Sequence, residues 1–191
     1  DYERVIDGFA KKAVADSRLE SADYYLTETV RALRSRHGVV AARAQPAALQ
    51  RVFDAQEKML AALSDVDPRL CVDFLHGRAS QAFFDFAAGA RPAVTELARA
   101  GLDAIVDGRD SRIQRAAPSD GDFAQLEAAL VARGLTRAEI ETLLDGKAAE
   151  PPLPDVAMCR AGRVYLQALK TLPEDVRLRI YALAVELLAR T

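Results

Sequence analysis

Apolar side chains recur at helical spacing along almost the whole of this 191-residue chain. In the last segment, Val176, Ile180, Leu183 and Leu187 follow the spacing that places side chains on one face of a helix. The composition agrees, because Ala, Leu and Arg favour helices, whereas strands favour aromatic and β-branched residues, and only 6% of this chain is aromatic. The sequence therefore predicts an all-α fold, an irregular bundle of about eight or nine helices.

Signals for helix starts and ends divide this pattern into segments. Ser or Thr followed three residues later by Glu or Asp predicts a capped start, and a proline suits the first turn. A glycine after the last periodic residue predicts a helix end. The predicted starts are Ser17, Pro46, Pro68, Pro92, Ser119 and Thr136, and the predicted glycine ends are Gly38, Gly108 and Gly134.

Two stretches interrupt the helical pattern. Residues 108–118 show no clear period and predict a long loop, and residues 147–154 must be extended, because each proline disfavours the helical region for the residue before it. The last predicted helix, over residues 174–190, is apolar on two sides, as is typical of a helix enclosed by its neighbours. We therefore expect this C-terminal helix to be central, to be the most buried, and to hold residues 1–191 together as a single domain.

Charge argues against nucleic-acid and membrane partners. The formal net charge is −2, so no global basic field attracts nucleic acid or anionic lipid. Residues 123–146 resemble a helix-turn-helix in spacing, but the second helix carries Glu139, Glu141 and Asp145 against Arg137 alone, and a DNA reader needs basic or amide side chains there. We expect a plain αα-hairpin. No apolar run approaches the roughly 20 residues that a transmembrane helix needs.

Residues 67–86 contain one of the two cysteines, one of the two histidines and four of the seven phenylalanines. If this stretch is one continuous helix, Cys71 lies in its apolar stripe, where a thiol behaves as a small hydrophobe. His76 lies about 140° further around that helix and cannot pair with Cys71. His37 is expected to cap its own helix just before Gly38. The alternative to a non-catalytic protein is an enzyme. Its site would have to be assembled from distant residues around His37, His76 and Asp73.

No other motif predicts chemistry. The cysteines and histidines lack the spacing of a metal site, and phosphate-binding loops and hydrolase signatures are absent, so we predict no metal, no cofactor and no catalytic residue. Gln56 lies within an apolar stripe. It is either a core amide hydrogen-bonded to a backbone end, an amide at the edge of the stripe that reaches water, or a polar anchor in a ligand cavity. Arg160, Arg163 and Lys170 share one face of a helix, which is either a solvated face or a docking surface. With Gln56 and His76, they are the candidate ligand or partner contacts.

Cys71 and Cys159 each lie shortly after a proline that marks a helix start. Two helices that enter a bundle from the same end can bring these cysteines together. We predict a disulfide between them, closing a loop of about 88 residues and worth about 4.5 kcal/mol in the chain-entropy model. Disulfides persist in oxidising compartments. The sequence begins with Asp1 rather than Met, as removal of an export signal, removal of an anchor or trimming of the chain would each leave it. We expect an exported, periplasmic location, with the cytoplasm as the alternative.

The chain is thus rich in helix caps and apolar stripes, without a constellation of reactive groups. We expect a non-catalytic helical module that binds a protein or a small apolar ligand, and keep the enzyme as the second class. A deep pocket with converging polar groups is the observation that separates the two classes. A closed, dry bundle with an exposed apolar patch favours the first class.

Overall fold

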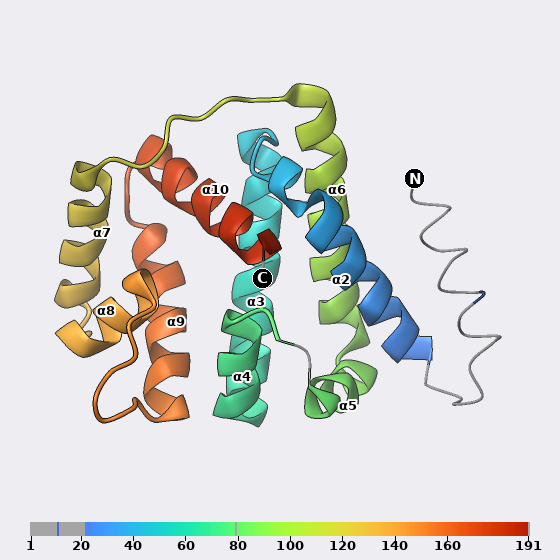
Figure 1. Cartoon of the computed structure of the whole chain (residues 1–191), viewed down its shortest axis with the longest axis horizontal. Helices are drawn as coiled ribbons and strands as arrows, with labels where there is room; N and C mark the ends of the chain where they lie inside the picture. The colour runs from blue at the N-terminus through green and yellow to red at the C-terminus, as the bar shows by residue number, and fades with distance from the viewer. Residues whose placement is uncertain (1–10, 12–21, 79, 191) are drawn as a thin grey trace.

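The computed structural model describes residue 11 and residues 22–78 and 80–190 (Figure 1). Every regular element in these ranges is a helix, which confirms the predicted all-α class. The predicted helix start at Ser17 lies outside the described residues. The nine helices of the described part are α2 (Ala22–Ala41), α3 (Pro46–Val66), α4 (Pro68–Leu75), α5 (Gln81–Gly89), α6 (Arg91–Ser111), α7 (Asp120–Ala132), α8 (Arg137–Asp145), α9 (Asp155–Leu169) and α10 (Glu174–Arg190).

The helix starts follow the capping residues that the sequence predicts. The Ser119 hydroxyl accepts a hydrogen bond from the Asp122 backbone N–H at 3.2 Å, and the Asp122 carboxylate accepts one from the Ser119 N–H at 2.9 Å. Thr136 and Glu139 form the same reciprocal pair at 3.3 and 2.7 Å. Each pair satisfies two of the backbone donors that a helix start leaves without a partner. Prolines occupy the first turns of α3, α4 and α6, as predicted.

Two of the glycines predicted as helix ends lie inside helices instead. α2 and α6 each continue for three residues beyond Gly38 and Gly108, so the loop predicted over residues 108–118 begins only at Arg112. A Cβ atom at Gly38 would lie 2.7 Å from that of Ala189, and one at Gly108 would overlap the carbonyl group of Val40. These two glycines therefore allow neighbouring helices to pack closely, and they do not end α2 or α6. Gly134, by contrast, has a positive φ of 79° and follows the end of α7 as predicted.

The segment 67–86 is not one helix. α4 ends at Leu75, and α5 begins at Gln81, where the Ser80 hydroxyl accepts a hydrogen bond from the Phe83 backbone N–H at 3.3 Å. Gly77 has a φ of 70°, a left-handed conformation that suits glycine and ends α4. The phenylalanines of this stretch that follow Ser80 therefore belong to a different helix from Cys71. The helical spacing of apolar residues continues from α4 into α5. The break between the two helices was therefore not visible in the sequence.

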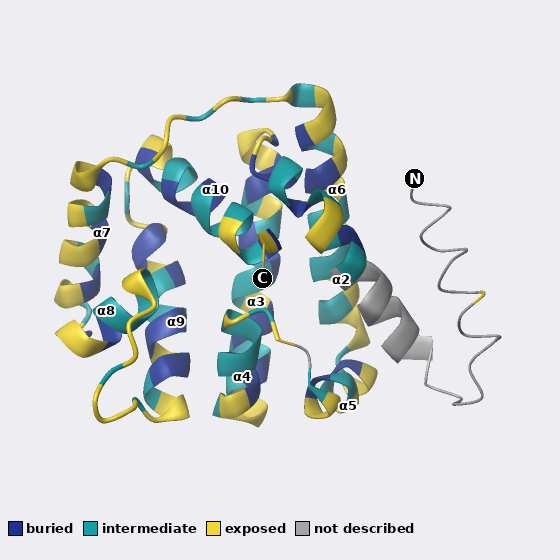
Figure 2. Cartoon of the chain, viewed as in Figure 1, coloured by how far each residue is buried: buried dark blue, intermediate teal, exposed yellow. Residues whose placement is uncertain are grey.

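The C-terminal helix is less buried than α3 and α9. Seven residues are buried in each of these two helices, against five in α10. α10 crosses the middle of Figure 1 and packs mainly on α2, with further contacts to α3 and α7. Its surface is only partly covered, since Figure 2 shows intermediate and exposed parts along α10. Leu187, at the end of its apolar stripe, is 54% exposed. The prediction that α10 is the most buried helix is therefore wrong.

Cys71 of α4 and Cys159 of α9 form a disulfide, with an S–S distance of 2.08 Å and a Cα–Cα distance of 5.5 Å. Both cysteines are buried. α4 and α9 lie side by side and begin at the same end of the bundle, as the prediction required (Figure 1). On the next turn of α9, Gly162 packs against Leu75 so closely that a Cβ atom would overlap the leucine side chain. The bond and this contact hold α4 against α9.

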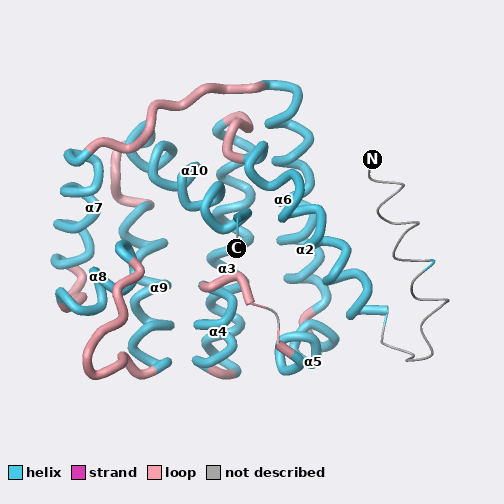
Figure 3. The backbone as a smooth tube through the Cα atoms, in the orientation of Figure 1, coloured by secondary structure: helices cyan, strands magenta, loops and turns pink. Residues whose placement is uncertain are grey.

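The two connections around α7–α9 are the long ones (Figure 3). Residues 112–119 run from α6 to α7, and residues 146–154 run from α8 to α9 without helix, as the prolines predict. Arg115, in the first connection, donates hydrogen bonds to the carbonyl oxygens of Ala42 and Ala44 and so fixes the loop against the end of α2. Among the described helices, none combines the length and the apolar character that crossing a bilayer requires.

Candidate functional site

A groove of about 330 Å³ opens between six helices of the described part of the chain. We call it the apolar groove. Its lining consists of Gln56 and Leu60 from α3; Phe74, Leu75 and the following His76 from α4; Phe123 from α7; Thr142, Leu143 and Leu144 from α8; Met158, Tyr165 and Leu166 from α9; and Ile180, Tyr181, Leu183, Ala184, Leu187 and Leu188 from α10.

No Asp, Glu, Lys or Arg is among these lining residues. The only lining side chain that can gain a charge near neutral pH is His76. Burial lowers the pKa of His76, the Arg78 guanidinium lowers it further, and Asp73 opposes them, so the imidazole stays neutral at pH 7. Transfer of an unpaired charge into such a lining is strongly unfavourable. The groove therefore suits an uncharged molecule.

Two tyrosines and a glutamine supply polarity inside the groove. The Tyr181 hydroxyl donates a hydrogen bond to Gln56 Oε1 at 2.8 Å, and the Tyr181 ring meets the Phe53 ring edge-on, with centroids 5.0 Å apart. Burial raises the pKa of both Tyr165 and Tyr181, so both phenols stay protonated. The sequence suggested a backbone partner for Gln56, but the structure gives it the hydroxyl of Tyr181. Gln56 lies in the groove lining, and its contact with a ligand stays a prediction.

Thr142 is the unusual polar residue of the lining. Its hydroxyl oxygen is buried and has no hydrogen-bond partner among the described residues. A buried hydroxyl without a partner costs about 1–3 kcal/mol of stability, and native proteins contain few such groups. Thr142 could not be recognised from the sequence, because a single threonine on a short helix forms no pattern.

The three residues of the enzyme alternative do not share this groove. His76 lines it, directly after the last turn of α4. The Asp73 carboxylate lies 3.7 Å from the Arg78 guanidinium and is not part of the lining. His37 belongs to α2, also outside the lining, and it is not in the last turn, because α2 continues to Ala41. The prediction that His37 caps its helix end is therefore wrong.

The basic face of α9 is engaged with neighbouring helices. Arg160 forms an ion pair with the buried Glu139 of α8 at 2.5 Å, and Lys170 forms one with Glu57 of α3. Burial raises the pKa of Glu139, but hydrogen bonds from Thr136 and the ion pair with Arg160 outweigh it and lower the pKa overall. The interpretation of this face as merely solvated is thus incomplete, since its cations join α9 to α8 and α3.

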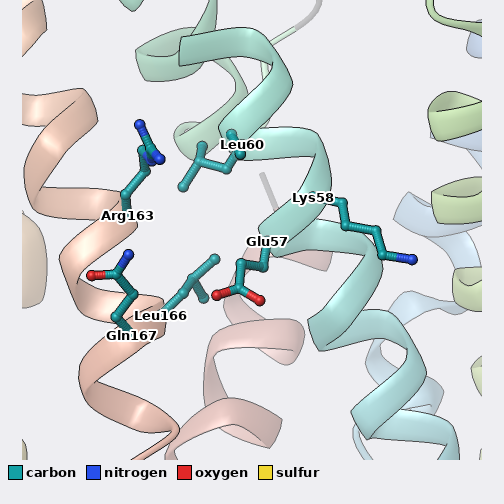
Figure 4. A pocket seen from close by; sticks show the side chains of 7 residues that line it. Glu57, Lys58, Leu60, Arg163, Leu166 and Gln167 are labelled. Carbon is teal, nitrogen blue, oxygen red and sulfur yellow. The ribbon is translucent and has the colours of Figure 1, made fainter. Parts of the chain in front are cut away.

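A smaller groove of about 230 Å³ lies between α3 and α9 (Figure 4). Arg163 borders it and donates a hydrogen bond to the Ser64 hydroxyl at 3.2 Å. Gln167 borders it one turn further along α9, and its side chain extends along α9 in the direction of Arg163 (Figure 4). Lys58 points away from α9 and pairs with Glu96 at 2.6 Å. Charged groups at its edge are already paired, so this groove makes a weaker candidate than the apolar groove.

The chain matches no protein-family model, no curated protein and no solved structure. Function is therefore inferred from the chemistry of the groove itself. The sequence carried one signal for it, namely that the C-terminal helix is apolar on two sides. We interpreted this pattern as evidence of complete enclosure, whereas residues of both sides, Leu183 and Leu187 on one and Tyr181 and Leu188 on the other, line the groove.

Proposed function

We propose that this protein is a non-catalytic helical module that binds a small, uncharged and mostly apolar molecule in the apolar groove. The observation that carries the proposal is a lining drawn from six helices without one charged side chain. Ligand sites are typically clefts of about 300–1,000 Å³ with mainly apolar walls and a few polar groups. The volume of about 330 Å³ lies at the small end of that range, which suits a ligand on the order of ten to fifteen non-hydrogen atoms.

The groove favours binding over catalysis. General acid–base chemistry needs a positioned proton donor or acceptor with a pKa suited to its task. The lining offers one imidazole, at His76, and no carboxylate, amine or thiol to work with it. The enzyme built around His37, His76 and Asp73 therefore remains the less favoured class. A small molecule is also a better match than a protein partner, because the groove has a volume of only about 330 Å³ and is bordered by six helices.

We also propose that the protein is exported and resides in an oxidising compartment such as the periplasm. The disulfide between Cys71 and Cys159 supports this location, since cytosolic thiols are mostly kept reduced. The cytoplasm remains the alternative location.

Two probes of equal size test the binding proposal. 2-Acetylnaphthalene is uncharged, and 2-naphthoate replaces its methyl group by a charged oxygen. We expect saturable binding of the ketone, with NMR shift changes confined to residues in and around the lining of the apolar groove. We expect binding of the carboxylate to be at least about tenfold weaker, because its charge would lose hydration. Equal binding of both probes contradicts the proposal.

Filling the groove provides the matched control. Ala184 lines the groove on α10, and Ala128 is exposed on α7 outside it. The substitution Ala184→Phe should abolish ketone binding by occupying the space, whereas Ala128→Phe should leave it unchanged. Circular dichroism and thermal unfolding show whether both variants keep the fold. Undiminished binding to a folded Ala184→Phe variant would place the ligand elsewhere.

A further inference from the structure

The polar side chains of the apolar groove differ in whether they are available to a ligand. The Tyr181 hydroxyl and Gln56 Oε1 are already bonded to each other. The Thr142 hydroxyl is fully buried, so a ligand cannot reach it, and His76 is exposed to bulk water. Tyr165 is the remaining polar residue of the lining. Its hydroxyl makes no hydrogen bond to any described residue and, unlike that of Thr142, is not fully buried.

Tyr165 faces the apolar groove from α9. It lies seven residues after Met158, about two helical turns, so both side chains project from the same side of α9, and both line the groove. Tyr165 does not border the smaller groove between α3 and α9. Burial raises the pKa of Tyr181, and the nearby Tyr165 raises it further. The two phenols are therefore neighbours, one with its hydrogen bond made within the protein and one without.

A phenol without a partner in apolar surroundings sets a requirement on the ligand. In the free protein, only water can pair with the Tyr165 hydroxyl. A purely apolar ligand would displace that water and leave the hydroxyl unpaired, which weakens binding. A ligand with a hydrogen-bond acceptor at this point regains the bond, and such a bond is electrostatically stronger in apolar surroundings than in water.

We propose that the Tyr165 hydroxyl recognises the polar group of the ligand by donating a hydrogen bond to an uncharged carbonyl oxygen. The inference rests on the proposed function of the groove and narrows its ligand class to neutral carbonyl compounds, such as ketones, esters and amides. A phenol is a better donor than acceptor, because its oxygen shares a lone pair with the ring, and a carbonyl oxygen only accepts. Carboxylates fall outside this class, because no cation lines the groove to offset their charge.

The experiment compares two probes of the same shape, 2-acetylnaphthalene and 2-isopropenylnaphthalene, which differ by C=O against C=CH₂. Tyr165→Phe keeps the ring and removes only the hydroxyl. We expect the ratio of ketone to alkene affinity to fall about threefold to tenfold in Tyr165→Phe, the range that one hydrogen bond accounts for. The ketone should bind this variant more weakly than the wild type, and the alkene more tightly, because it no longer leaves a hydroxyl unpaired. A merely structural effect would move both affinities in the same direction.

Tyr181→Phe is the matched control. It removes a hydroxyl from the same groove whose bond to Gln56 is already made, so the free energy of unfolding should fall while the affinity ratio stays within about twofold of the wild type. Tyr165→Phe should leave the free energy of unfolding nearly unchanged, because no hydrogen bond within the protein is lost. An equal fall of the ratio in both variants would contradict the specific role of Tyr165.

The outcomes separate this inference from the proposed function. If the wild type binds both probes and Tyr165→Phe leaves their ratio unchanged, the role of Tyr165 is wrong while the groove stands. If neither probe binds the wild type, the proposed function fails, and this inference fails with it.

A second measurement observes the hydrogen bond directly. The ¹³C signal of a ketone carbonyl moves to higher frequency when its oxygen accepts a hydrogen bond. We expect this shift for carbonyl-labelled 2-acetylnaphthalene bound to the wild type, relative to the same ketone in cyclohexane, and a smaller shift for the ketone bound to Tyr165→Phe. The same carbonyl signal in both proteins would overturn the assignment of Tyr165.

Discussion

Arg179 of α10 donates two hydrogen bonds to the carboxylate of Asp122, from Nε at 2.9 Å and from Nη2 at 2.8 Å. The same carboxylate accepts the Ser119 backbone N–H at the start of α7. Asp122 is only 4% exposed. Its sequence neighbour Phe123 lines the apolar groove, as does Ile180, the residue after Arg179. One buried carboxylate therefore both caps α7 and fixes it to the helix that forms the opposite wall of the groove.

This ion pair should make the protein acid-sensitive. The Arg179 guanidinium and the Ser119 backbone hold the pKa of Asp122 well below its usual range. The pKa of an unfolded aspartate is about 3.9. A depressed pKa contributes stability above that value, and the contribution is lost as pH falls towards the folded pKa. We expect the free energy of unfolding, from urea titrations between pH 7 and 2, to fall below about pH 4, and to fall less in Asp122→Asn.

Asp175 provides the control for this prediction. Its carboxylate also accepts a hydrogen bond from Arg179, at 3.0 Å, but its side chain is 68% exposed. Asp175→Asn should therefore lower stability much less than Asp122→Asn at pH 7, because an exposed ion pair is weak. Equal acid sensitivity of the wild type and Asp122→Asn would contradict the role of Asp122.

Two glycines of α6 should respond to alanine in opposite directions. At Gly108 the new methyl group would overlap the backbone of Val40, and relief requires α2 and α6 to move apart. We expect Gly108→Ala to lower the free energy of unfolding by about 1–3 kcal/mol or more. At Gly101 no atom lies within 4 Å of the added methyl group, so Gly101→Ala should stabilise the protein by up to about 1 kcal/mol. Thermal unfolding of both variants checks the pair, and a stable Gly108→Ala would refute the packing argument.

These glycines show where sequence reasoning stops. Caps such as those at Ser119 and Thr136 were predictable, because a cap is made by residues three positions apart. Gly108 gives the same local signal as a helix end, and only the approach of a distant helix decides its role. The two apolar sides of α10 were likewise ambiguous, since the spacing between helices determines whether such a side is enclosed or lines a groove. Thr142 could be recognised as a lining residue only after the packing of the helices around the groove was known.

The disulfide could be predicted from the sequence, because the chain has only two cysteines, each near a helix start, and they can form only one pair. We expect Cys71→Ala/Cys159→Ala to lower the free energy of unfolding by about 2–5 kcal/mol. Urea titrations of this variant and of reduced wild type should give matching losses. A single transition in the oxidised protein is the expected result if residues 1–191 form one domain. An unchanged stability would show that the bond contributes nothing to the fold.

Thiol alkylation checks the same bond and the proposed location. Freshly isolated, unreduced protein should take up no label even after unfolding, and two labels after reduction, as read from its intact mass. Two labels without reduction would leave both the disulfide and the exported location without support.

Two substitutions on α10 compare a buried position with a partly exposed one. Ile180 and Leu183 both belong to the apolar stripe that the sequence predicts for this helix, and both line the apolar groove. Ile180 is only 3% exposed and belongs to the core, whereas Leu183 is partly exposed. Ile180→Asp should prevent cooperative folding, because it places an unpaired charge in the interior.

Leu183→Asp should instead fold, because its carboxylate can reach water at the groove opening. The same charge makes the lining unsuitable for an apolar molecule, so we expect loss of 2-acetylnaphthalene binding with a melting transition that stays cooperative. The two measurements are thermal unfolding by circular dichroism and titration with the ketone. Retention of ketone binding by folded Leu183→Asp would contradict the position of the ligand. Unfolding as complete as that of Ile180→Asp would show that the wall at Leu183 is part of the core after all.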